Sequence, residues 1–157
     1  HHQAVWDAAS RGWFTGDTFG ISYREFDGPR GVDDCYIMPS STPVQFEPDA
    51  VHASVARMEA EQPTAMYLTH YAQVTDVPRL AADLHRLIDA HVAIAERHAA
   101  AGDVRTALIE RDVWALVGEE AQRQGWTLPE TEWRALLALD VELNAQGLDV
   151  WLDARGK

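Results

Sequence analysis

The sequence has almost no lysine, a single cysteine and no long apolar run. With Cys35 alone, no internal disulfide can form, so the redox compartment stays open. Acidic side chains outnumber Lys and Arg by 25 to 13, and Lys157 is the only lysine. The net charge of −12 argues against nucleic acid or an anionic membrane as a partner. No apolar run approaches the roughly 18 residues that cross a bilayer, and we expect a cytoplasmic location.

What the sequence does contain is typical of a folded domain. Its 157 residues are 46% hydrophobic and 24% charged, which is enough to bury a core as one domain. There is no internal repeat and no low-complexity tract. The pattern changes after Asp76, which divides the chain into residues 1–76, with strands and a helix, and residues 77–157, with helices only.

Short apolar segments separated by turn residues make the first part β-rich. Residues 9–12 have the composition of a hairpin turn. The expected strands are residues 3–8, 12–15, 36–38 and 65–68. A helix is expected from Asp49 to about Glu61. A helix followed by a strand is the order found in α/β layers, so we predict an α/β fold for this part.

Apolar residues at helical spacing predict three helices in the second part. The first begins near Pro78 and closes at Gly102. Asp103 is expected to cap the second, which ends near Gly125. The third begins at about Thr131. The chain is therefore predicted to be an α/β region followed by a helical C-terminal subdomain.

Two strand-to-loop junctions each end in a potential metal ligand. Asp17 follows an apolar segment and lies between Gly16 and Gly20, and His70 follows the strand expected at 65–68. A strand places its last side chain at the edge of the sheet, so we expect the two side chains within about 7 Å of each other at one edge. A turn aspartate and a surface histidine are simpler interpretations of the same pattern.

Three segments of the chain resemble the metallo-β-lactamase (MBL) fold hydrolase superfamily. Residues Phe14–Gly20 resemble the segment that carries its bridging aspartate, and Leu68–Tyr71 is similar to its late histidine motif. Residues 140–148 are similar to the C-terminal helix of a glyoxalase II-like bacterial branch. The resemblance implies half of an αββα sandwich in residues 1–76 and a helical C-terminal subdomain in residues 77–157.

The resemblance also implies a binuclear metal site. Asp17 would be the catalytic residue that bridges two divalent metal ions, and His70 would bind the second ion. Zinc is the first expectation, with iron or manganese as alternatives, because carboxylate and imidazole suit all three. The implied reaction is hydrolysis of an ester, thioester or lactam in a small-molecule acyl substrate.

The sequence departs from the family in its ligand set. The His-x-His-x-Asp-His signature is absent, and so is the Gly-His segment expected ahead of Asp17. We therefore expect the C-terminal half of a hydrolase, with His1 and His2 as native sequence. Such a chain alone should be inactive and bind metal weakly or not at all. The alternative is a non-catalytic half-domain that folds or acts only with a partner segment.

A half-sandwich should also expose part of one sheet face. Val5, Trp13 and Phe14 are the apolar side chains expected there. Exposed apolar side chains of this kind promote association, so a homodimer or a complex with the missing N-terminal half is expected.

The other histidines favour ordinary packing or surface roles. His85, His91 and His98 are six and seven residues apart on one helix, whereas a helical metal pair prefers a spacing of four or three. His52 is interpreted in the same way.

The tryptophans and the cysteine are interpreted as structural. The six tryptophans indicate core packing, with contact between Trp114 or Trp133 and substrate as an alternative. Cys35 has no basic residue nearby in the sequence and is expected to be inert.

Overall fold

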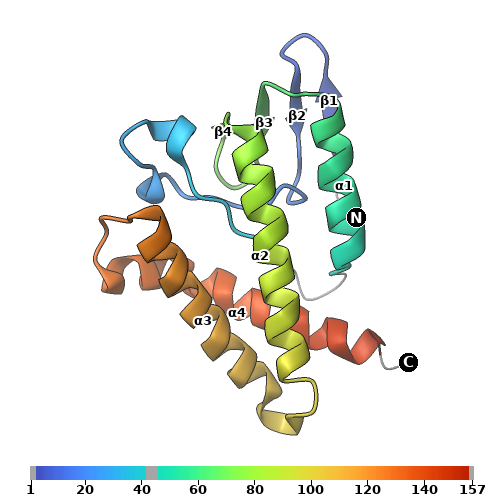
Figure 1. Cartoon of the computed structure of the whole chain (residues 1–157), viewed down its shortest axis with the longest axis vertical. Coiled ribbons are helices and arrows are strands. Elements are labelled where there is room, and N and C mark those ends of the chain that lie inside the picture. Colours follow the sequence, from blue (N-terminus) through green and yellow to red (C-terminus); the bar gives the residue numbers. More distant parts are fainter. Residues whose placement is uncertain (1–2, 42–45, 156–157) are drawn as a thin grey trace. The chain divides into compact units, whose positions relative to one another are not determined.

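The computed structural model describes residues 3–41 and 46–155 as a mixed α/β protein. The chain divides into two compact units. The described residues of unit 1 are 3–40 and 49–87, and those of unit 2 are 41, 46–48 and 88–155. The division falls between Leu87 and Ile88, inside helix α2 (Val77–Arg97), so this helix contributes to both units (Figure 1).

Unit 1 is built around a mixed sheet with the strand order β1-β2-β3-β4. Strand β1 (Val5–Asp7) pairs antiparallel with β2 (Gly12–Phe14), β2 pairs parallel with β3 (Ala65–Tyr67), and β3 pairs antiparallel with β4 (Gln73–Val74). Parallel neighbours require a crossover connection, and helix α1 (Pro48–Ala60) lies within it. Because β2 and β3 run in the same direction, they end at the same edge of the sheet.

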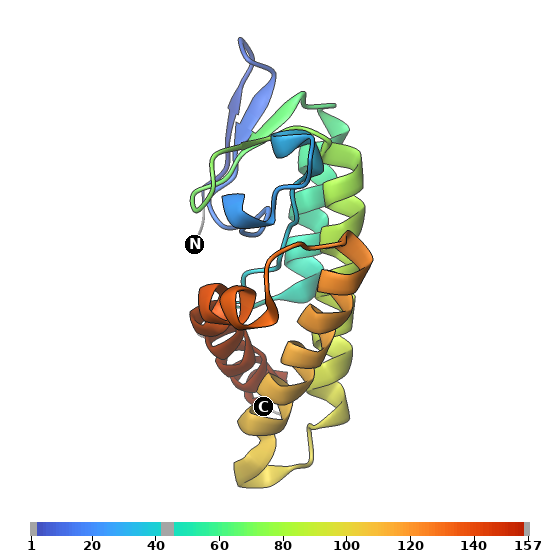
Figure 2. The same ribbon diagram turned by 90° about the vertical axis from the view of Figure 1, so that its left-hand side faces the viewer.

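One face of this sheet is covered by helices. Laterally paired residues point to the same face, which places Trp6, Trp13, Met66 and Val74 together. Met66 and Val74 are fully buried. The indole N–H of Trp13 donates to the carbonyl oxygen of Met58 in α1, at 3.2 Å. Figure 2 shows α1 and the N-terminal part of α2 along this side of the sheet.

The opposite face carries a row of apolar side chains, Val5, Phe14 and Tyr67, which we call the open face. The three residues are register partners across β1, β2 and β3. Val5 is 56% exposed and Phe14 is 51% exposed, and the Phe14 ring stacks on Tyr67 with ring centroids 4.7 Å apart. The expected exposure of Val5 and Phe14 is confirmed. The expectation for Trp13 is wrong, because its register with Met66 turns it toward the helices.

Unit 2 is helical in its described residues. The C-terminal part of α2 is followed by a 3-10 turn (Gly102–Val104) and by helices α3 (Arg105–Gln124) and α4 (Glu130–Arg155). Helices α3 and α4 pack against each other. Their fully buried apolar residues are Ile109, Val113 and Val117 on α3 and Leu137, Val141, Ala145 and Leu148 on α4. Spacings of four on α3, and of four and three on α4, place each set on one helix face, as an amphipathic helix requires.

A short segment before α1 also belongs to unit 2. The backbone N–H and the hydroxyl of Ser41 both donate to Oδ1 of Asn144 in α4, at 2.8 and 3.0 Å. Both residues are buried, so each satisfies a polar group that would otherwise be costly to bury. The ring of Phe46 meets Trp151 of α4 edge-on, with centroids 6.1 Å apart. These contacts attach Ser41 and Phe46 to α4, which lies far from them in the sequence.

Two local expectations are wrong. Residues 36–38 form no strand and make only an isolated bridge, between Met38 and Ile21. Their apolar run reflects burial of an irregular segment, since Tyr36, Ile37 and Met38 are each at most 3% exposed. Asp103 makes no capping hydrogen bond, because it lies inside the 3-10 turn that precedes α3.

The ends of two helices follow the sequence signals closely. Gly125 terminates α3 in the left-handed conformation, with φ of 66°. Pro78 lies in the first turn of α2, as expected. Within the described residues, no helix combines the length and the apolar character that crossing a bilayer requires.

Candidate metal site

The parallel pairing of β2 and β3 brings the two predicted ligands to one edge of the sheet. The register pairs Phe14 with Tyr67 at the ends of the two strands. The ladder continues for one further bond, since the backbone N–H of Thr15 donates to the Tyr67 carbonyl oxygen at 3.1 Å. Beyond this bond each strand turns away, and Asp17 and His70 lie in the two turns.

The turn that carries Asp17 depends on glycine. Gly16 has φ of 56° and Gly20 has φ of 76°, values that other residues adopt at a cost. The Gly20 N–H donates to the Asp17 carbonyl oxygen at 3.0 Å, which closes the turn. A Cβ atom on Gly20 would clash with the carbonyl oxygen of Met38. The sequence between these glycines therefore fixes the backbone on which the carboxylate is presented.

The turn that carries His70 is held by its neighbour Tyr71. The Tyr71 hydroxyl donates to the Asp27 carboxylate, and the Arg24 guanidinium lies 4.6 Å from the Tyr71 ring centroid. Arg24 also pairs with Asp27 at 3.6 Å. Burial, together with the hydrogen bond to Asp27, raises the pKa of the Tyr71 hydroxyl, so it remains a donor at neutral pH. The sequence analysis missed this cluster because its members are far apart in the chain.

Asp17 and His70 meet directly. Nε2 of His70 lies 3.4 Å from Oδ1 of Asp17, so the expected proximity at one sheet edge is confirmed. The side chain of Asp17 is 21% exposed and that of His70 is 61% exposed. The carboxylate is thus largely covered, while the imidazole lies at the surface, where a further group can approach it.

The distance fits two ligands of one metal ion. Ligands about 2.0 to 2.1 Å from a tetrahedral ion are about 3.3 to 3.4 Å apart. A charged hydrogen bond between the same atoms would be shorter, at about 2.7 to 2.9 Å. The contact is thus longer than a hydrogen bond and lies within ion-pair range, and its length is also compatible with two ligands of one ion. In the described part of the chain, no group of three His, Cys, Asp or Glu side chains is arranged to hold a metal, so the pair is incomplete as it stands.

The other residues weighed in the sequence have different surroundings. His91 is buried, and His98 contacts Asp112. Burial raises the pKa of the Cys35 thiol to about 11, which keeps it protonated and unreactive. His1 and His2 lie outside the described residues.

Two of the tryptophans form part of an aromatic cluster in unit 2. The Trp114 and Trp133 ring centroids are 6.2 Å apart, and the Arg134 guanidinium lies 4.8 Å from the Trp114 centroid. Trp133 is buried, which agrees with a packing role. A contact between this cluster and substrate stays a prediction.

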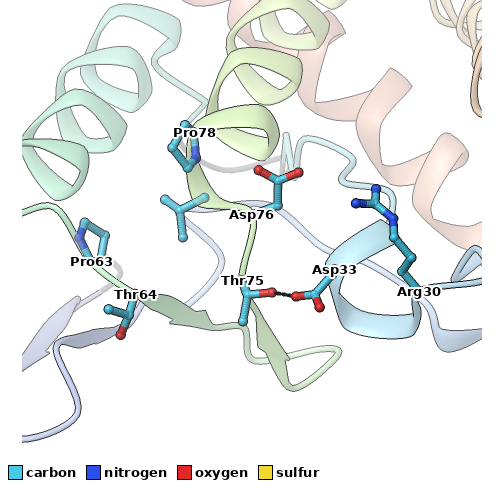
Figure 3. Close-up of a pocket in the computed structure, with 8 residues that line it drawn as sticks. Arg30, Asp33, Pro63, Thr64, Thr75, Asp76 and Pro78 are labelled. Carbon is cyan, nitrogen blue, oxygen red and sulfur yellow. Dashed lines mark hydrogen bonds between the residues drawn. The ribbon is translucent and has the colours of Figure 1, made fainter.

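A polar hollow of about 580 Å³ lies in unit 1 without involving Asp17 or His70 (Figure 3). Its acidic groups already have partners. The Thr75 hydroxyl donates to the Asp33 carboxylate, and Arg79 pairs with Asp76 at 2.8 Å. The hollow is therefore a surface feature whose acidic groups are already paired, and it does not include the two predicted ligands.

Comparison with models of protein families, with curated proteins and with solved structures finds no match to this chain.

Proposed function

We propose that this chain forms part of a binuclear metal-dependent hydrolase with the metallo-β-lactamase fold. The observation that carries the proposal is the 3.4 Å contact between His70 Nε2 and Asp17 Oδ1 at the ends of neighbouring parallel strands. Asp17 and His70 would hold part of a two-ion centre, zinc first and iron or manganese as alternatives. The remaining ligands would come from a partner segment, and the chain together with that segment is called the assembled enzyme below.

The proposed chemistry is acyl hydrolysis of an ester, thioester or lactam in a small molecule. When bound, the ions supply a water activated for attack near neutral pH and polarise the acyl carbonyl. A carboxylate has two oxygens, so Asp17 can serve two cations from one rigid turn. His70 offers one nitrogen, and its exposed ring leaves room for substrate on the solvent side. We also propose that the chain is cytoplasmic.

The test is hydrolysis of a chromogenic ester by the assembled enzyme and by the chain alone, with metal content measured in parallel. The assembled enzyme should show metal-dependent turnover, and the chain alone should show none, because two ligands cannot hold a working pair of ions. Metal-dependent turnover by the chain alone would show that the remaining metal ligands do not come from a partner segment. Absence of turnover in the assembled enzyme with zinc, iron and manganese would overturn the hydrolase proposal.

A second candidate function is a non-catalytic half-domain that acts only with a partner segment. The exposure of Val5 and Phe14 on the open face favours it, because packing these side chains under another layer would remove apolar surface from water. Both candidate functions require association with a partner segment, but only the first requires catalysis. Binding of a partner segment without any gain of turnover would select the second.

A further inference from the structure

Two histidines from different helices of unit 1 meet ring to ring. Nδ1 of His52 on α1 lies 2.5 Å from Nδ1 of His85 on α2, and the ring centroids are 4.8 Å apart. The two distances differ by about twice the distance from an imidazole ring centroid to its own nitrogen. Both nitrogens must therefore lie close to the line that joins the two centroids. With an interplanar angle of 20°, the rings are nearly coplanar and face each other edge to edge.

The in-plane lone pair of each Nδ1 therefore points at the same place. Two bare lone pairs would repel at this distance, so one ring carries the proton and donates it to the other. Two imidazole nitrogens that face each other can also share a zinc, copper or nickel ion, provided that the rings turn so that both lone pairs point at the ion. The gap now held by one shared proton would have to widen to admit it.

A carboxylate supports the arrangement from behind. Nε2 of His85 lies 3.6 Å from Oε2 of Glu59, two helical turns beyond His52 on α1. This is an ion-pair distance rather than a hydrogen bond, and the nearby negative charge favours the tautomer with its proton on Nε2. In that tautomer the lone pair of His85 lies on Nδ1, toward His52. Carboxylate, imidazole and metal in this order are a recurring arrangement in metalloproteins, where the carboxylate sets the tautomer and orientation of the ligand.

We propose that His52 and His85 bind a divalent transition-metal ion of the zinc class through their Nδ1 atoms, with Glu59 orienting His85. The side chains of His85 and Glu59 are 29% and 35% exposed, so the ion and completing waters have access. The two nitrogens must separate to about 3.3 Å, the edge of a coordination tetrahedron. The ion would connect α1 to α2, and it shares no residue with the Asp17–His70 pair.

The experiment is a zinc titration of the 157-residue chain by calorimetry, after removal of metal with a chelator. The background carries Asp17→Asn and His70→Gln, so that the candidate hydrolase ligands do not contribute. One saturable site is expected in this background. His52→Gln and His85→Gln should each weaken it by at least tenfold, and Glu59→Gln should weaken it less. Unchanged binding in both histidine variants would overturn the proposal, and so would the absence of a saturable site in the Asp17→Asn, His70→Gln background.

A second measurement protects the test against misfolded variants. In the unsubstituted chain, zinc should shift the imidazole ¹⁵Nδ1 resonances of His52 and His85 together, at one common half-saturation. Circular dichroism of His52→Gln and His85→Gln should match that of the unsubstituted chain. Zinc-dependent shifts confined to other histidines would overturn the proposal whatever the variants do. Loss of the Asp17–His70 function would leave this result untouched, so the two proposals fail separately.

Discussion

Two contacts between a histidine and an aspartate, both within the part of the chain that the structure describes, differ in length and in exposure. His98 and Asp112 lie 2.7 Å apart with side chains 12% and 13% exposed. His70 and Asp17 lie 3.4 Å apart with side chains 61% and 21% exposed. The first contact joins the turn after α2 to α3 in unit 2, and the second joins two turns at a sheet edge in unit 1.

The difference shows how surroundings assign a role to one pair of residue types. Asp112 also accepts from Arg97 at 3.0 Å and pairs with Arg111 at 2.7 Å, so its oxygens are occupied. The His98 hydrogen bond, with help from these arginines, lowers the pKa of Asp112 to about 2. Such a carboxylate stabilises the fold. The Asp17–His70 contact is longer and more exposed, so a further group can approach it from solvent.

The largest expected effect is catalytic. In the assembled enzyme, Asp17→Ala should reduce turnover of a chromogenic ester by more than the roughly 10- to 100-fold cost of losing a supporting partner of a metal ligand. His70→Ala should empty one of the two metal positions and reduce turnover less. Steady-state kinetics and metal analysis of both variants measure this. Undiminished turnover after Asp17→Ala would reject the site.

The next effect concerns stability and tests the His98–Asp112 contact. Asp112→Asn should lower the free energy of unfolding at pH 7 by about 1 to 2 kcal/mol, because it weakens a largely buried charged contact. The pKa of Asp112 is depressed from 3.8 to about 2, so its contribution is present above about pH 4 and is lost as the pH falls toward 2.

Urea unfolding from pH 6 to pH 2 measures this stability contribution. The difference between the unsubstituted chain and Asp112→Asn should shrink on acidification. Asp103→Asn is the matched control, since Asp103 makes no capping hydrogen bond, and it should change the free energy of unfolding by less than about 0.5 kcal/mol. A difference for Asp112→Asn that stays constant down to pH 2 would contradict the assignment.

A smaller effect is expected on the open face. Val5→Ser combined with Phe14→Ser should reduce self-association of the chain, because it removes exposed apolar surface. Leu139→Ser is the control, since Leu139 is also exposed, at 63%, but lies on α4. Sedimentation velocity measures the association of all three proteins. Equal loss of association after Leu139→Ser would show that self-association does not depend on the open face.

The smallest effect is expected at Tyr71. Tyr71→Phe removes the hydroxyl that donates to Asp27 and should cost about 0.5 to 1.5 kcal/mol of unfolding free energy. It should also weaken any metal response of His70, because the turn that presents the ring becomes looser. Thermal unfolding and zinc titration test the two parts. Arg24→Gln, which removes the cation above the Tyr71 ring, should act in the same direction.

The sequence predicts the local pieces of this fold better than their long-range partners. Alternation and turn residues locate β1 and β2, and apolar spacing with Pro78 and Gly125 locates the long helices. The Asp17–His70 contact follows from the same signals, because both residues lie in the turns that follow strands which prove to be parallel neighbours. These are properties of short windows of sequence.

The pieces that escaped prediction depend on tertiary context. No local signal links Ser41 to Asn144 or His52 to His85, because each pair is brought together by packing of distant segments. Residues 36–38 have the apolar character of a strand, yet burial in an irregular segment produces the same composition. An apolar run can therefore indicate either a buried irregular segment or a strand paired in a sheet, and the sequence alone does not separate the two.

The most direct test of the central claim is a zinc titration of the assembled enzyme, followed through the imidazole ¹⁵N resonances of this chain. The account predicts that the Nε2 resonance of His70 moves with zinc and that Asp17→Asn shifts its half-saturation to higher zinc. The His98 resonances should stay in place, because Asp112 already holds that ring in a packed contact. A His70 resonance that ignores zinc, or one that responds identically with and without the Asp17 carboxylate, would contradict the claim that these two residues form a ligand pair.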